Sequence, residues 1–203
     1  MEFLDHKKSL IISIFSWLVD FGNKWLTLSH WIFRSGKNIF LKLEIMMLVL
    51  TAICIALLIT IHQLPYWLAF VIAILLIQRV LEFVIVYSRN FILNRGRIFS
   101  EFHDMEKRGQ WLILMFSLNI IQIILIFAIW YRLISFLDPS AFSSSLNILD
   151  SFYFSIVTFL TVGYGDITPL TALPKVLVIT QAILTFYTIV IVINGLISIH
   201  FRR

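Results

Sequence analysis

Two glycines flank one tyrosine in TFLTVGYGDITP, residues 158–169, which lies between long apolar stretches. The whole chain has only seven glycines, so their concentration here indicates a backbone with special torsion angles. Glycine adopts positive or alternating φ angles at low steric cost. With such angles at Gly163 and Gly165, successive carbonyl oxygens would point in one direction, and Val162 and Tyr164 would pack behind them. A ring of carbonyl oxygens can replace the hydration shell of a cation.

The composition places this loop in a membrane protein. Of 203 residues, 60% are hydrophobic and 13% are charged, and the mean hydropathy is +0.96. A water-soluble domain of this size cannot bury so much apolar surface. The N-terminal MEFLDHKKSL mixes acidic and basic residues and is not followed by a small-residue cleavage site, so we expect no cleaved signal peptide. The single cysteine, Cys54, is expected to be a small buried residue.

Four segments are predicted to cross the membrane as helices, because about 20 apolar residues are needed to span roughly 30 Å of hydrocarbon. They are residues 42–62, 67–88, 111–136 and 174–199. A fifth apolar segment, 149–160, is too short to cross. The predicted fold class is therefore an all-α integral membrane protein.

Four regions follow from these elements. We expect interfacial amphipathic helices on the cytoplasmic side in 1–40 and a peripheral transmembrane hairpin in 41–88. A basic cytoplasmic linker is expected in 89–110, and the glycine loop with its flanking helices in 111–203.

Residues 9–33 are expected to lie along the membrane surface as one or two amphipathic helices. Their three tryptophans favour the membrane–water interface. The alternative is a further spanning helix, but it would place Asp20 and Lys24 near the middle of the bilayer, where charge is costly.

The basic residues orient the chain. Thirteen of the sixteen lie before the first predicted span, between the second and third, or after the fourth: Lys7, Lys8, Lys24, Arg34, Lys37, Lys42, Arg89, Arg95, Arg97, Lys107, Arg108, Arg202 and Arg203. Cytoplasmic loops carry an excess of Lys and Arg, so we expect a multi-pass plasma-membrane protein with both termini in the cytoplasm. These flanking bases account for the pI near 9.5 and suit anionic lipids rather than nucleic acid.

The glycine loop must reverse direction at bilayer depth. Irregular backbone is tolerated there only where protein buries it or where it lines a watery cavity. The half-span 149–160 and the loop are therefore predicted to form a re-entrant pore loop, with Asp150 capping the helix and the partly negative helix C-terminus favouring a cation. One chain supplies one oxygen per level and has no second copy of the motif. A complete ring therefore requires a homotetramer around a central pore.

The hexapeptide TVGYGD resembles the signature of the potassium-channel family. The likeness extends over SFYFSIVTFLTVGYGDITP and the flanking helices, roughly residues 111–199. It implies a prokaryotic-type subunit with an outer helix, a pore helix, a selectivity filter and an inner helix over 111–136, 149–160, 161–166 and 174–199. It also implies passive, selective conduction of K⁺ through the tetrameric pore.

The resemblance assigns the ion sites to main-chain carbonyls and one side-chain hydroxyl. The carbonyls would be those of Thr161, Val162, Gly163 and Tyr164, the hydroxyl would be that of Thr161, and Gly165 would complete the filter. K⁺ would be bound at these positions as the permeant ion, with no other cofactor.

Several neighbours of the filter are assigned by the same resemblance. Tyr153 and Phe154 would pack behind it, and Asp166 would accept a hydrogen bond from the pore helix. Two residues depart from the family pattern. Leu160 replaces a usual threonine and removes a hydroxyl ring below the filter. Val157 replaces the glutamate of some bacterial members, so Asp166 would lack a buried carboxyl partner.

The inner helix supplies candidate cavity and gate residues. Gln181 and Thr185 lie four positions apart on one helix face and are candidates, with Leu160, to line a cavity. The family's hinge glycine would fall near Thr185, but the glycine in this segment is Gly195. The gate is therefore expected either at Gly195 or at the helix end near Ile197 to Phe201.

The second predicted span contains one arginine, Arg79, three positions before Glu82. A voltage sensor needs an arginine-rich helix, so we do not expect steep voltage gating. Two interpretations stay open: a structural ion pair on one helix face, and a vestigial sensor or coupling pair. Gln122 of the third span is expected to form a hydrogen bond with a neighbouring helix.

No catalytic pattern accompanies these features: the sequence shows no nucleophile–base pair, phosphate-binding loop or metal-ligand spacing, so we expect no enzyme. We expect no ligand-binding regulatory domain either, so gating would respond to lipid, tension, pH, ions or a separate regulatory subunit.

Two other functions stay open. One is a non-selective cation channel on the same scaffold, and the other is a modulatory or non-conducting subunit of a potassium channel or transporter.

Overall fold

The computed structural model describes residues 10–26, 39–89 and 105–200, and the structural statements below refer to this part of the chain. The remaining residues include the last part of the predicted interfacial segment 9–33, most of the basic linker and part of the predicted gate near Phe201. They are residues 1–9, 27–38, 90–104 and 201–203, and they lie outside the described part.

The described residues form helices and no strand. In chain order these are α1 (Leu10–Leu26), α3 (Ile39–Thr60), the 3₁₀ turn η1 (Ile61–Gln63), α4 (Tyr66–Tyr87), α5 (Met105–Leu137), α6 (Ile148–Phe159) and α7 (Ala172–His200). The helices α3 (continued by η1), α4, α5 and α7 are long and apolar enough to cross a membrane. The predicted all-α membrane fold class is confirmed.

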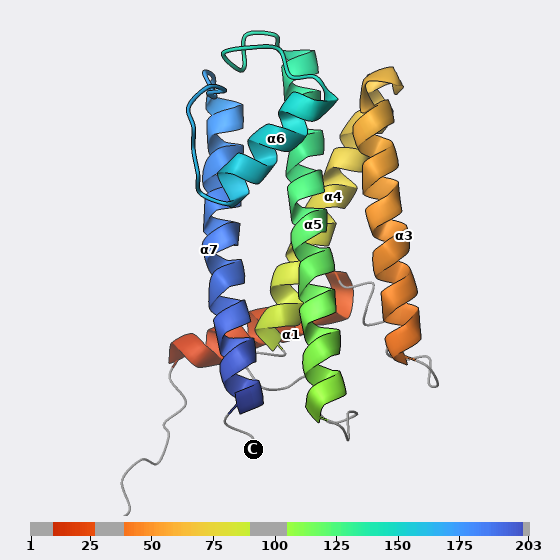
Figure 1. Cartoon of the computed structure of the whole chain (residues 1–203), viewed down its shortest axis with the longest axis vertical. Helices are drawn as coiled ribbons and strands as arrows, with labels where there is room; N and C mark the ends of the chain where they lie inside the picture. Colours follow the sequence, from red (N-terminus) through yellow and green to blue (C-terminus); the bar gives the residue numbers. More distant parts are fainter. Residues whose placement is uncertain (1–9, 27–38, 90–104, 201–203) are drawn as a thin grey trace, which may run out of the picture.

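The helix α5 lies at the centre of the bundle, with α3 on one side, α6 and α7 on the other, and α4 crossing behind it toward α7 (Figure 1). Its apolar segment is 61% buried within the chain, against 22% for α3 and α4 and 28% for α7. The other spans therefore keep most of their apolar surface available to lipid or to other subunits.

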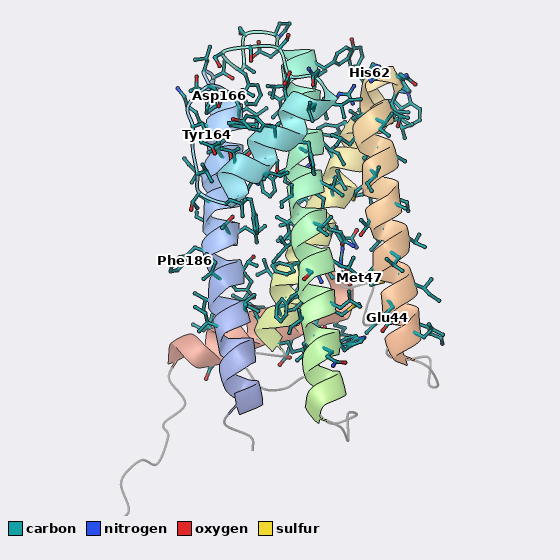
Figure 2. All side chains as sticks on the ribbon, in the orientation of Figure 1. Glu44, Met47, His62, Tyr164, Asp166 and Phe186 are labelled. Carbon is teal, nitrogen blue, oxygen red and sulfur yellow. The ribbon has the colours of Figure 1, made fainter. Side chains whose placement is uncertain are left out.

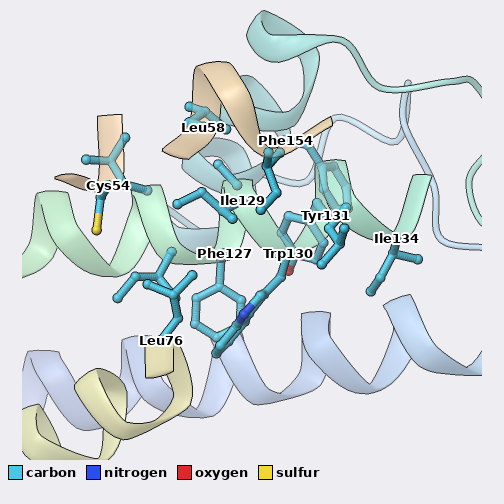
Figure 3. Packing of buried hydrophobic residues seen from close by; sticks show 14 of the residues in the cluster. Cys54, Leu58, Leu76, Phe127, Ile129, Trp130, Tyr131, Ile134 and Phe154 are labelled. Carbon is cyan, nitrogen blue, oxygen red and sulfur yellow. The ribbon is translucent and has the colours of Figure 1, made fainter. Parts of the chain in front are cut away.

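The core follows α5. Its side chains Phe127 and Tyr131 are fully buried, and the Tyr131 ring lies 4.9 Å from that of Phe154 on α6 and 5.9 Å from that of Phe142. Figure 3 shows Cys54 and Leu58 of α3 and Leu76 of α4 in the same cluster. The prediction that Cys54 is buried is confirmed.

The boundaries of the four membrane-length helices and of α6 differ from those predicted by one to six residues. The helix α5 begins at Met105, six residues before the predicted outer helix, so part of the predicted linker 89–110 is helical. The added residues EKR are good helix formers but polar, so hydropathy alone does not detect them. The pore helix α6 is shifted by one residue. The inner helix α7 starts two residues early, with Pro174 in its first turn, where a missing N–H costs no helical hydrogen bond.

A polar cluster joins α3, α4 and α5. The Arg79 guanidinium donates to Glu82 Oε2 at 3.0 Å, to Gln122 Oε1 at 2.9 and 3.0 Å, and to Asn119 Oδ1 at 3.2 Å. Gln122 Nε2 in turn donates to the Met47 carbonyl oxygen at 2.9 Å. The ion pair predicted from spacing is present, and the predicted helix–helix role of Gln122 is confirmed. The peripheral hairpin is thereby linked to the central helix.

The helix α1 lies across one end of the bundle, crosswise to the spans (Figure 1). It packs against α4 at Gly22, where a Cβ atom would lie 2.7 Å from Cδ1 of Ile85. A side chain at position 22 would therefore require the end of the Ile85 side chain to move. With 17 residues, α1 is not one of the four candidate spans.

Candidate functional site

The short helix α6 is anchored at its N-terminus and in its middle. Asn147 is the N-cap: its side chain accepts from the Asp150 N–H at 2.9 Å, while the Asp150 carboxylate accepts from the Asn147 N–H at 3.4 Å. Asp150 was predicted to cap the helix; it does so from the N3 position of a capping box, with Asn147 as the N-cap. In mid-helix, the Ser155 hydroxyl donates to the Ile124 carbonyl oxygen of α5 at 2.7 Å.

The chain turns sharply where α6 ends. The Thr161 N–H donates to the Thr158 carbonyl oxygen at 3.1 Å, and the Val162 N–H donates to that of Val157 at 2.9 Å. These bonds occupy carbonyl groups that the end of a helix leaves unpaired. They also fix the direction in which the glycine loop departs.

The backbone torsions alternate along the loop. The φ angle is positive at Thr161 (56°), Gly163 (60°) and Gly165 (80°), whereas Val162 and Tyr164 are not among the positive-φ residues. Glycine adopts such positive φ angles at low steric cost. The glycines therefore stand where the backbone needs left-handed torsion.

In a single chain the loop borders open space. Tyr164 is 71% exposed and Val162 is 48% exposed. A Cβ atom built at Gly163 or Gly165 would meet no heavy atom of the described structure within 4 Å. Figure 2 shows Tyr164 and Asp166 at the same edge of the molecule as Phe186 of α7. The loop is thus presented at one edge of the bundle.

Tyr153 of α6 supports the outer end of the loop. Its hydroxyl donates to Asp166 Oδ2 at 2.8 Å, and its ring is stacked on that of Tyr164, with centroids 6.5 Å apart. The hydrogen bond that Asp166 was expected to accept from the pore helix is present. Figure 2 labels both loop residues, Tyr164 and Asp166.

Phe154 occupies a different place from the one predicted. Its ring packs against Tyr131 and Phe142 in the core rather than behind the filter. Adjacent residues on a helix point about 100° apart, so Phe154 points away from the direction in which Tyr153 meets Tyr164. Val157 is buried, and Leu160, just after α6, is 60% exposed.

The hydrogen bond from Tyr153 holds the pKa of Asp166 below its usual range, with a smaller contribution from backbone N–H groups. A carboxyl with a lowered pKa contributes stability above its ordinary pKa of about 4, and this contribution is lost as the pH falls through the lowered value. The ionised carboxylate therefore supports the loop at neutral pH and over a mildly acidic range.

Replacing Tyr153 with phenylalanine is expected to make the loop more sensitive to acid. The acid is applied on the side of the membrane that Asp166 faces. Without the hydroxyl donor, the pKa of Asp166 should rise toward its ordinary value, and the pH at which the conduction implied by the resemblance falls should rise with it. Current recorded against pH in reconstituted bilayers measures that shift. Tyr66→Phe, at the exposed start of α4, is the control; equal midpoints in Tyr153→Phe and the control would contradict the assignment.

Gln181 does not line a cavity; it is fully buried inside its own chain. Its Oε1 accepts from the Tyr131 hydroxyl at 2.7 Å, and its Nε2 donates to the Ser155 carbonyl oxygen at 2.9 Å. Gln181 thus joins α5, α6 and α7. Thr185, one turn further along, is 3% exposed. This face of α7 is turned toward the chain's own core, which corrects the cavity-lining prediction for both residues.

Gly195 lies within α7, whose helix continues to His200 without interruption. The surroundings of this glycine lie outside the described part of the structure. Its role as a gate stays a prediction, as does that of the helix end.

Gln181→Leu is expected to destabilise the protein by about 1–3 kcal/mol, because buried hydrogen-bonding groups on Tyr131 and Ser155 lose a partner. Thermal unfolding in detergent micelles measures the loss. The matched control is Thr180→Ala, at the neighbouring exposed position, where little change is expected. A Gln181→Leu protein as stable as the control would show that these bonds contribute nothing.

Two supporting residues, Asn147 and Ser155, and one torsion angle escaped the sequence analysis. The pattern Asn147-x-x-Asp150 is a helix-start signal that could have indicated the N-cap. Nothing in the sequence marks Ser155 as the link between α6 and α5. Thr161 was assigned as an ion ligand, but its left-handed φ was not predicted; for a residue other than glycine this costs roughly 1–2 kcal/mol.

In the second half of the chain, a short helix and a loop lie between two membrane-length helices. Residues 119–202 match the family model described as ion channel. Similar segments occur in three relatives: "Two-pore potassium channel 4" of Arabidopsis thaliana (40% identical over 73 residues), "Potassium channel K2" of Plasmodium falciparum (48% over 68) and "Two pore potassium channel c" of Oryza sativa subsp. japonica (39% over 64). Residues 119–202 are thus similar to an ion-channel domain, and the three relatives that share similar segments are named as potassium channels.

The matches cover part of each protein. They span 36%, 33% and 30% of this chain, and 25%, 5% and 14% of the three relatives in the same order. No solved structure matches the chain.

Proposed function

We propose that this chain forms a homotetrameric, potassium-selective channel that conducts passively. The observation that carries the proposal is the alternation of positive φ at Thr161, Gly163 and Gly165, in the sequence context of a potassium-channel relative. Carbonyls aligned in this way can replace the hydration shell of K⁺. In this proposal, the ion sites are the carbonyls of residues 161–164 and the Thr161 hydroxyl.

The exposure of the loop supports a tetramer. One chain contributes one carbonyl per level, and Gly163 and Gly165 border open space. The α7 edge beside the loop is also apolar and exposed, at Val176 (56%), Ile183 (66%) and Phe186 (70%). Four copies around an axis would cover this edge and complete each ring of oxygens.

The surroundings of Arg79 argue against steep voltage gating. This side chain is 12% exposed and is bonded to α4 and α5. A gating charge must move through the membrane field, and moving Arg79 would break these bonds. We therefore propose that Arg79 and Glu82 form a structural pair.

We further propose a plasma-membrane location with both termini cytoplasmic, following the excess of basic residues on that side. The end of the bundle bearing α1 is then cytoplasmic and the loop opens outward. Anionic lipids and a separate regulatory subunit stay candidate partners.

Reversal potentials across bilayers with opposing K⁺ and Na⁺ gradients test the proposal. A reversal potential near the K⁺ equilibrium value is expected. Equal permeability would indicate the non-selective channel instead. Purified protein that neither conducts nor forms tetramers, judged by cross-linking, would indicate a modulatory subunit.

A further inference from the structure

The helix α1 presents three different faces around its axis. One is buried, and its Gly22 lies against Ile85 of α4; it consists of Val19, Gly22 and Asn23. A second is exposed and apolar, consisting of Ile14, Trp17, Leu18 and Phe21. A third is exposed and polar, consisting of Ser13, Asp20 and Lys24. At about 100° per residue, these faces lie roughly a quarter to two fifths of a turn apart.

The exposed apolar face is large and ordered. Its four side chains are 51–63% exposed, and the rings of Trp17 and Phe21 are stacked with centroids 5.7 Å apart. The helix lies crosswise at the end of the spans (Figure 1). A helix at a membrane surface has hydrocarbon on one side and water on another, and α4 lies against the third face of α1. The buried face thus contacts α4, the apolar face suits hydrocarbon, and the polar face suits water.

The same end of α4 also contacts the inner helix. Ser88 Oγ lies 2.7 Å from the Tyr187 hydroxyl of α7, and that hydroxyl donates to the Val84 carbonyl oxygen at 2.8 Å. One residue further along, Arg89 Nε lies 3.9 Å from Asp20 Oδ1 of α1. The segment 84–89 therefore has α1 on one side and α7 on the other.

We propose that the lipid–water interface is a regulatory partner of this channel. The apolar face of α1 lies among the acyl chains, and a shift of α1 in the interface is transmitted through residues 84–89 to Tyr187 on the inner helix. The lipid contact is inferred from the geometry of α1 alone and does not require that the protein conducts. The transmission rests on the proposed function, because conduction is needed to detect it.

Accessibility of spin labels tests the lipid contact without any need for conduction. In a Cys54→Ala background, single cysteines at Ile14, Phe21, Ser13 and Lys24 are labelled, and the full chain is placed in phosphatidylcholine–phosphatidylglycerol vesicles. At Ile14→Cys and Phe21→Cys, collisions with oxygen should exceed those with a water-soluble nickel complex. The ratio should reverse at Ser13→Cys and Lys24→Cys. Nickel dominance at Ile14 and Phe21, or exclusion of both probes by a neighbouring subunit, would overturn the proposal.

Single-channel recording tests the transmission. Phe21→Asp should change the open probability by about fivefold or more, the size of an ordinary coupling between sites, whereas Ser13→Asp on the polar face should not. If Phe21→Asp does not assemble, Leu18→Ser serves in its place. In a Tyr187→Phe background the effect should be lost, because the hydroxyl link is absent. The same fold-change with and without that hydroxyl would overturn the transmission. Absence of current in the unmodified channel would count against the proposed function and leave the accessibility result standing.

Discussion

Replacing Gly163 or Gly165 with alanine is expected to abolish potassium current while the helices stay folded. Both residues have positive φ, 60° and 80°, a region that costs an L-residue about 1–2 kcal/mol. A steric clash is not the cause of the expected loss, because a Cβ atom at either glycine would meet nothing within 4 Å in the single chain. The alanine backbone should relax toward negative φ and rotate a carbonyl out of the row. In a tetramer the strain recurs in four chains, about 4–8 kcal/mol in total.

Single-channel recording in bilayers measures this loss, and circular dichroism checks the helices. Gly109→Ala is the matched control, because this glycine of α5 has ordinary φ and likewise meets nothing within 4 Å. The control should conduct like the unmodified protein. A Gly163→Ala channel with unchanged conductance and selectivity would show that the alternating torsion is not what presents the ion ligands.

Removing the Glu82 carboxylate is expected to cause the largest loss of stability. Glu82 is 1% exposed and accepts from Arg79, whose side chain is 12% exposed. Breaking a buried ion pair by removing one partner costs about 3–5 kcal/mol, because the other charge is left uncompensated. Glu82→Leu should therefore lower the free energy of unfolding by about that amount.

Denaturant unfolding in detergent micelles, followed by circular dichroism, measures the change. Arg79→Met in addition should recover part of the loss, because it removes the uncompensated charge. Recovery is incomplete because Gln122 and Asn119 lose a donor. Leu75→Ala, on the exposed face of α4, is the control for truncation. If Glu82→Leu were no less stable than the control, the pair would contribute little.

The parts of the site that sequence analysis predicted depend on local backbone chemistry. Gly163 and Gly165 indicated left-handed torsion because glycine adopts it at little cost, and both have it. The spacing of Arg79 and Glu82 indicated an ion pair because residues three apart on a helix are neighbours. Four long apolar runs indicated four membrane-length helices. This prediction was also local, because the length and hydropathy of a segment depend only on its own residues.

The errors share a different cause. Gln181 was assigned to a cavity, and Phe154 to the back of the filter, from their positions along a helix. Which way a helical face points depends on the rotation of that helix against its neighbours. In an apolar helix such as α7 the sequence shows no polar side to reveal this rotation.

By itself, then, the sequence determined the membrane fold class, the four membrane-length helices and the place of the glycine loop, because each needs only neighbouring residues to be recognised. The tertiary structure alone decided that Gln181 joins three helices, that Phe154 belongs to the core, and that the end of α4 lies between α1 and Tyr187. These arrangements arise from the packing of segments far apart in the chain, where each helix is rotated and placed by all of its partners together.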